Sequence, residues 1–118
     1  MTKYPHKGYT LVEIMIVVSI IAAIVAIILP NYLKASRTSA RNVCINNLKQ
    51  IDGAVERWAL DYNIPSGIVP SSSQEEEVYG YIESGMPRCP SGGVYTIHAV
   101  GSKPQVTCSR EDEGHVLP

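Results

Sequence analysis

One acidic residue lies inside a strongly apolar stretch near the N-terminus of this 118-residue chain. Of the 19 positions from 11 to 29, 17 are apolar, and Glu13 is the charged exception. A carboxylate costs about 2.5–3.5 kcal/mol at the centre of a bilayer and less near its edge, so it usually has a partner there. Gly8 follows Lys7 just before the stretch. Gly8 and Glu13 are therefore the first candidates for a specific role.

The other reactive side chains are three cysteines and two histidines beyond the apolar stretch: Cys44, Cys89, His98, Cys108 and His115. Their spacing contains neither C-x-x-C nor H-x-x-x-H. We therefore do not expect the cysteines to form a metal site with His98 or His115. The loop before the last cysteines lacks the acidic cluster of a calcium site. The chain also lacks G-x-S-x-G, H-E-x-x-H and a phosphate loop, so we expect neither an enzyme nor a cofactor.

A disulfide is the preferred role of two cysteines if this part of the chain lies outside the cytoplasm. We predict Cys89–Cys108, because this bridge closes a loop of 18 intervening residues and would contribute about 3 kcal/mol. A bridge through Cys44 stays open, since three cysteines allow three single bridges. A membrane-tethered thiol oxidoreductase using Cys89 or Cys108 is the enzyme-class alternative, and it requires a reactive thiol in the native protein.

A long helix must position these side chains. Nineteen helical residues rise about 28 Å, close to the hydrocarbon thickness of a bilayer. Pro30 cannot donate a hydrogen bond within a helix, so a kink is expected there. The helical pattern resumes after it with apolar residues spaced 4, 3, 4, 3 and 4 positions apart, at Cys44, Leu48, Ile51, Val55, Trp58 and Tyr62. This spacing is one face of an amphipathic helix, and it predicts a single helix over 9–62.

The remaining residues, 63–118, predict a small head and an α+β fold. Ser73 and Glu76 have the spacing of a capping box at the start of a short helix. Alternating apolar residues over 94–100 and 106–108 predict an antiparallel hairpin that packs on the amphipathic helix. A helix of about 80 Å is too long for these 56 residues to bury. Its first half must therefore be covered by lipid or by other subunits.

The segment Lys7-Gly8-Tyr9-Thr10-Leu11-Val12-Glu13 and the apolar run after it resemble the N-terminus of type IV pilins and type II secretion pseudopilins. The resemblance implies a pilin-like fold, cleavage by a prepilin peptidase after Gly8, and N-methylation of Tyr9, where the family usually has phenylalanine. It divides the chain into a leader (1–8), a transmembrane or filament-core helix (9–30), an amphipathic helix (31–62) and a head (63–118).

The expected function is that of a structural subunit of a helical homo-oligomeric filament, in a pilus, competence or secretion system. Cleavage frees an amine at Tyr9, which can pair with Glu13 of a neighbouring subunit, and Pro30 lies in the same assembly segment. The resemblance implies further partners: minor pilins or pseudopilins, the prepilin peptidase, an inner-membrane assembly platform and inner-membrane lipid.

The expected location is a single pass through a bacterial inner membrane, with the head outside the cytoplasm, followed by a periplasmic or extracellular filament. Two lysines precede the apolar run and four cations follow it, which by itself favours the opposite orientation. The resemblance outweighs that count.

The alternative to a filament subunit is a single-span membrane protein that never polymerises and keeps its leader. Nucleic acid is a possible partner if the filament is a competence pilus, and it would bind the basic stretch Lys34, Arg37, Arg41 and Lys49. This stretch has no interleaved aromatic residues, so it is a weak candidate.

Overall fold

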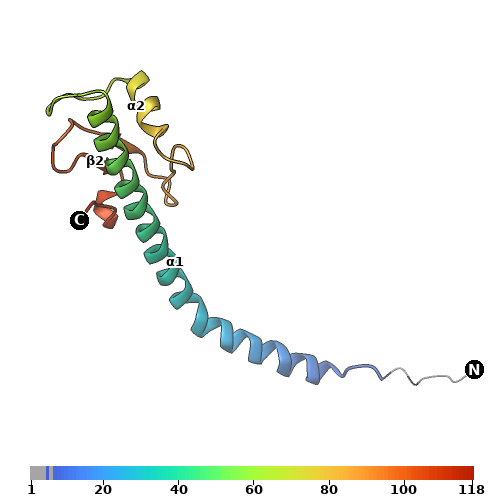
Figure 1. The fold of residues 1–118 in the computed structure, drawn as a ribbon. Coiled ribbons are helices and arrows are strands. Elements are labelled where there is room, and N and C mark those ends of the chain that lie inside the picture. The colour runs from blue at the N-terminus through green and yellow to red at the C-terminus, as the bar shows by residue number, and fades with distance from the viewer. Residues whose placement is uncertain (1–4, 6) are drawn as a thin grey trace, which may run out of the picture. The chain divides into compact units, whose positions relative to one another are not determined.

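One long helix and a small head make up the chain in the computed structural model, which describes residues 5 and 7–118 (Figure 1). The elements are α1 (Leu11–Asp61), α2 (Ser72–Tyr79), β1 (Tyr95–Ile97), β2 (Val106–Cys108) and a 3-10 helix η1 (Glu111–Glu113). The predicted α+β fold is confirmed. Residues 1–4 and 6 of the predicted leader lie outside the described residues.

Both ends of α1 are set by local side-chain and backbone chemistry. At the start, the Glu13 backbone N–H donates to Thr10 Oγ1 at 3.2 Å, so Thr10 is the N-cap. At the end, Asn63 adopts a left-handed φ of 53°. The Ile64 N–H donates to the Ala59 carbonyl at 2.8 Å, and the Asn63 N–H to the Leu60 carbonyl at 3.3 Å. This is a Schellman ending, and it stops the helix within a residue of the predicted boundary.

The chain divides into two compact units, residues 1–36 and residues 37–118. In the first unit, α1 continues through Pro30 and no described side chain is buried. The apolar part of the helix is long and apolar enough to cross a membrane. Its side chains therefore have no covering partner within this unit.

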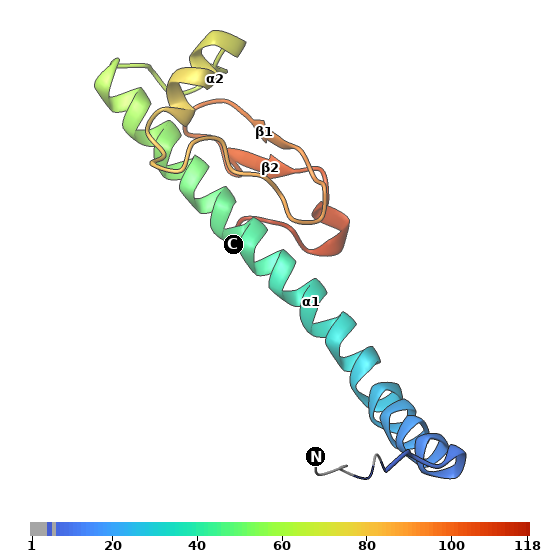
Figure 2. The ribbon, with the colours of Figure 1, turned by 90° about the vertical axis from the view of Figure 1, so that its right-hand side faces the viewer.

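The second unit has one core, formed mainly by α1 and the hairpin (Figure 2), with Val78 of α2 and the loop residues Cys89 and Val100 added. Five of the six residues of the predicted helical stripe are buried, whereas Tyr62 is 57% exposed. The strands pair antiparallel, with Tyr95 opposite Cys108 and Ile97 opposite Val106, and these four side chains face the core. The predicted hairpin and its packing on the helix are confirmed.

Helix α2 begins earlier than the sequence indicated. Its N-cap is Ser71, whose backbone N–H donates to Gln74 Oε1 at 2.9 Å, so the predicted Ser73/Glu76 capping box is wrong by two positions. Three successive serines offer competing caps, and tertiary contacts decide among them. One such contact is the Trp58 Nε1–H bond to Glu77 Oε2 at 3.1 Å, which ties α2 to α1.

Candidate functional site

The Gly8–Tyr9 peptide bond is open to solvent. Gly8 is exposed, and a Cβ built on it would meet no atom within 4 Å. The Tyr9 side chain is 80% exposed, and both residues precede the first turn of α1. Nothing in the described fold protects this bond, so its geometry suits attack by a peptidase.

Glu13 lies in the first turn of α1, four positions after Tyr9. A carboxylate is favoured in this turn because the helix dipole is positive there. Thr10 and Glu13 have capping-box spacing, and Thr10 caps the Glu13 backbone N–H. The sequence analysis missed this role of Thr10, although Thr-x-x-Glu before an apolar run is the signal for it. The two ion pairs found among the described residues do not involve Glu13.

The surface of α1 around Glu13, from Leu11 to Leu33, is predominantly apolar on all sides. Its large hydrophobic side chains are about half exposed or more. They are Leu11, Val12, Ile14, Met15, Ile16, Val17, Val18, Ile20, Ile21, Ile24, Val25, Ile27, Ile28, Leu29 and Leu33. A helix that is hydrophobic all round needs lipid or other helices as its surroundings.

The three cysteines meet at one point in the head, together with one histidine. One possible ligand atom from each of Cys44, Cys89, Cys108 and His115 lies within 4.8 Å of the other three, and all four residues are buried. The cysteines are free thiols in this structure, so the Cys89–Cys108 disulfide stays a prediction. Sequence spacing did not predict a metal site here, because these residues come from four separate segments. His98 is exposed and outside the cluster.

The thiols in this cluster differ in acidity. Burial raises the pKa of Cys44 to about 12, although the Tyr95 hydroxyl opposes this shift. Burial also acts on Cys89, but backbone hydrogen bonds at Ser91 and Gly93, together with the neighbouring thiols, outweigh it and lower the pKa of this thiol. Of Cys44 and Cys89, Cys89 is therefore the thiol that more readily carries a negative charge.

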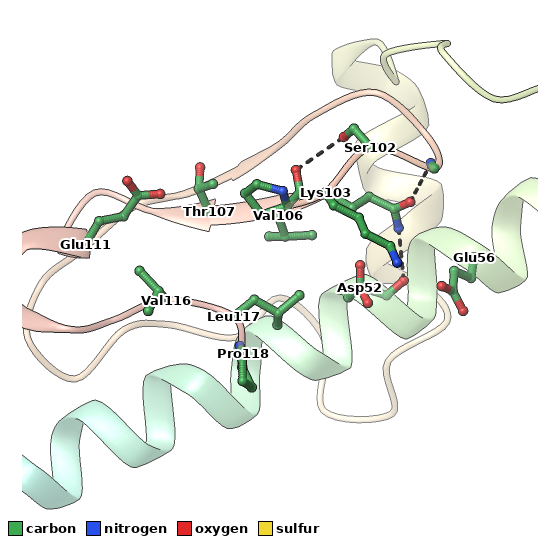
Figure 3. Close-up of a pocket in the computed structure, with 13 residues that line it drawn as sticks. Asp52, Glu56, Ser102, Lys103, Val106, Thr107, Glu111, Val116, Leu117 and Pro118 are labelled. Atoms are coloured by element: carbon green, nitrogen blue, oxygen red, sulfur yellow. Dashed lines mark hydrogen bonds between the residues drawn. The ribbon is translucent and has the colours of Figure 1, made fainter.

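A separate pocket of about 470 Å³ lies between α1 and the C-terminal segments (Figure 3). Asp52 and Glu56 line it from α1, Lys103 from the turn before β2, and Glu111 from η1. Burial raises the pKa of Asp52, and the negative charge of Glu56 adds to this. The Asp52 backbone carbonyl accepts a hydrogen bond from Gln105 Nε2 at 3.3 Å, which anchors one wall. The pocket contains no cysteine or histidine.

The N-terminal sequence matches a known family. The family described as "Prokaryotic N-terminal methylation motif" matches residues 4–29, which include Gly8, Tyr9 and Glu13. The N-terminal segment is similar to this motif. The motif covers the exposed peptide bond, the capped first turn and most of the apolar surface described above.

Relatives of this chain extend the similarity beyond the methylation motif. "Type II secretion system core protein G" of Klebsiella pneumoniae is 27% identical over an alignment of 112 positions, which covers 86% of this chain and 80% of the relative. "ComG operon protein 3 homolog" of Bacillus licheniformis is 27% identical over 87 residues, which are 74% of this chain and 84% of the relative. No solved structure matches. The resemblance to pilins and pseudopilins inferred from the sequence is confirmed.

Proposed function

We propose that the protein is a structural subunit of a type IV-pilus-like, competence or type II secretion filament. The observation that carries this proposal is a methylation motif joined to a helix whose apolar surface has no cover within its own unit. Similarity to a secretion-system core protein and to a ComG operon protein supports it. The role is structural rather than enzymatic. The alternative is a single-span protein that never polymerises.

Cleavage of the leader creates the positively charged partner that Glu13 requires. Cleavage after Gly8 by a prepilin peptidase leaves a new amine on Tyr9, which is then methylated. Glu13 is four residues further on, one helical turn away. When subunits stagger along a filament, the Tyr9 amine of one subunit reaches Glu13 of its neighbour. Each charge then has a counter-charge in an apolar interior, which is the condition for burying either one.

The apolar helix serves two environments in succession. Before assembly, inner-membrane lipid covers it and the head lies outside the cytoplasm. After assembly, other subunits cover it, with minor pilins or pseudopilins and the assembly platform as further partners. Pro30 leaves the Ala26 carbonyl without its helical donor, so the helix can bend there as it packs.

Replacing Glu13 by Ala tests the assembly step. Membrane insertion and head folding should be retained, because the change makes the span more apolar and lies outside the core. Filament assembly should fail, since the docking amine would be buried without a partner, at a cost of up to about 3–5 kcal/mol. Filaments are counted by electron microscopy, and protein in the membrane fraction is measured in parallel.

The matched control is Glu76→Ala, which removes an exposed carboxylate from α2. This variant should assemble normally. Normal filament numbers for Glu13→Ala would refute the docking role.

Mass spectrometry of the N-terminal peptide separates the two functions, because a filament subunit begins at methylated Tyr9 and a non-polymerising anchor retains Met1–Gly8. Replacing Gly8 by a bulky residue should block cleavage, and this variant therefore tests the peptidase step.

A further inference from the structure

The buried cluster in the head has the ligand set of a structural metal site. Cys44 comes from α1, Cys89 from the loop before β1, Cys108 from the end of β2 and His115 from the segment after η1. Three thiols and one imidazole form the Cys₃His set of closed, four-coordinate zinc sites. We propose that these four residues bind one Zn²⁺ ion that holds the head together.

The distances in the cluster are close to those of a zinc tetrahedron. With Zn–S bonds of about 2.3 Å and a Zn–N bond of about 2.0–2.1 Å, two sulfurs lie about 3.8 Å apart, and a sulfur and a nitrogen about 3.6 Å apart. The Cys89 Sγ and His115 Nδ1 atoms are 3.5 Å apart, and no pair among the four ligand atoms exceeds 4.8 Å. Side-chain movements of about 1 Å or less complete the tetrahedron.

A hydrogen-bonded tyrosine contacts one of the ligands, and a carboxylate lies near a second. The Tyr95 hydroxyl donates to Cys44 Sγ at 3.5 Å and accepts a hydrogen bond from Asn47 Nδ2 at 3.1 Å. On the other side, His115 Nε2 is 4.0 Å from Glu113 Oε2. Because Nδ1 faces Cys89, Nε2 is the nitrogen left to carry a proton toward this carboxylate. A second ring nitrogen directed at a carboxylate is the usual arrangement of a metal-bound histidine.

The loop that carries Cys89 is built for close approach of the backbone to sulfur. A Cβ on Gly93 would lie 2.5 Å from Cys108 Sγ and 3.2 Å from Cys89 Sγ. Gly92, with a φ of 77°, turns the chain just before it. Backbone N–H groups that point at thiolates stabilise their negative charge. A complex of one Zn²⁺ with three thiolates keeps a net negative charge, so this stabilisation also applies to the zinc-bound site. The two glycines therefore serve the cluster and not only the turn.

A zinc ion would bind all four residues of the cluster, whereas a disulfide would involve only two of them. A Cys89–Cys108 bridge would use two of the four groups and leave Cys44 and His115 buried beside it without a role. A zinc ion uses all four and links the helix, the loop, the hairpin and the C-terminal segment. Binding would replace the three thiol protons by bonds to Zn²⁺ and release them to solvent. A small head gains most from such a link, because its core is small.

Metal analysis of the full-length protein tests this inference. The protein is purified in mild detergent from the membrane of its own host, without chelator, and its zinc content is measured. We expect about one zinc ion per chain for the wild type, and background levels for Cys44→Ser and His115→Gln. The matched control is His98→Gln, which alters an exposed histidine outside the cluster and should retain the zinc.

Cobalt binding and alkylation give a readout that does not depend on variants folding. Reduced wild-type protein titrated with Co²⁺ should show thiolate-to-cobalt charge-transfer absorption and the visible bands of a tetrahedral site, and Zn²⁺ should abolish both. The three thiols of the purified protein should resist iodoacetamide until a chelator is added. A Cys89–Cys108 disulfide in the purified protein would overturn the proposal. Failure of the reduced protein to bind Co²⁺, or retention of zinc by both ligand variants, would overturn it as well.

Discussion

Gly93 shows how one residue without a side chain can determine local packing. The atoms nearest to a Cβ at this position would be Cys108 Sγ, Arg110 Cγ at 3.1 Å and Cys89 Sγ. Two of these atoms belong to buried cysteines. Gly53 is the opposite case. It lies inside α1, and a Cβ added there would meet no atom within 4 Å.

Substituting these two glycines by alanine should change stability in opposite directions. Gly93→Ala forces atoms into a filled core and should destabilise the head by about 1–3 kcal/mol. Gly53→Ala should stabilise it by up to about 1 kcal/mol, because alanine favours the helix. Thermal unfolding followed by circular dichroism measures both. A Gly93→Ala protein as stable as the wild type would show that the loop can move away from the two sulfurs.

At the scale of elements, α2 is held on α1 by few polar contacts. The buried Trp58 ring donates its Nε1–H to Glu77, and the Tyr81 hydroxyl donates to Asp61 Oδ2 at 2.7 Å, beyond the end of α2. Bonding to the Asp61 carboxylate raises the pKa of Tyr81 to about 12. Glu77 thus has a specific partner in Trp58, on α1.

Removing the Glu77 acceptor should loosen α2. Glu77→Ala leaves the Trp58 N–H buried without a partner, which should cost about 1–3 kcal/mol. Glu77→Gln keeps an acceptor oxygen and should cost much less. Chemical denaturation followed by tryptophan fluorescence compares the two variants, because Trp58 is the chain's single tryptophan. Equal losses for both variants would mean that charge, and not the hydrogen bond, holds the helix.

At the scale of the whole molecule, the core and the apolar helix are separate parts of the chain. Every buried residue that the structure describes lies at or after Cys44, and residues 37–118 form a compact unit. The residues that give the protein its membrane-like character thus contribute nothing buried to the head. Folding of the head and insertion or assembly of the helix can then be altered independently.

A fragment of residues 37–118 should fold without the N-terminal unit. We expect a soluble protein whose melting temperature lies within a few degrees of that of the full chain, because no core contact is lost. Size-exclusion chromatography and thermal unfolding check this. Aggregation or an unfolded spectrum would show that the apolar half of α1 is needed for the head to form.

The sequence by itself determined the features that depend on local pattern. The apolar run, Gly8 and Glu13 lie within about thirty residues of the N-terminus, so they indicated the methylation motif without knowledge of the fold. The spacing from Cys44 to Trp58 predicted the buried face of α1, because a helix repeats its faces over a few residues. Alternation predicted the hairpin for the same reason. Each of these repeats lies within a single helix or hairpin, so tertiary contacts did not alter the secondary structure that they predicted.

Long-range packing, which sequence spacing does not reveal, brings the three cysteines and His115 together. The four residues of the cluster are separated by 45, 19 and 7 positions, and no periodic pattern links such distant sites. The hairpin register places Tyr95 opposite Cys108, and packing on α1 brings both to Cys44. The segment after η1 then adds His115, which short-motif reasoning had no means to place. The sequence spacing argued against a metal site, and long-range packing assembled the ligand set of one.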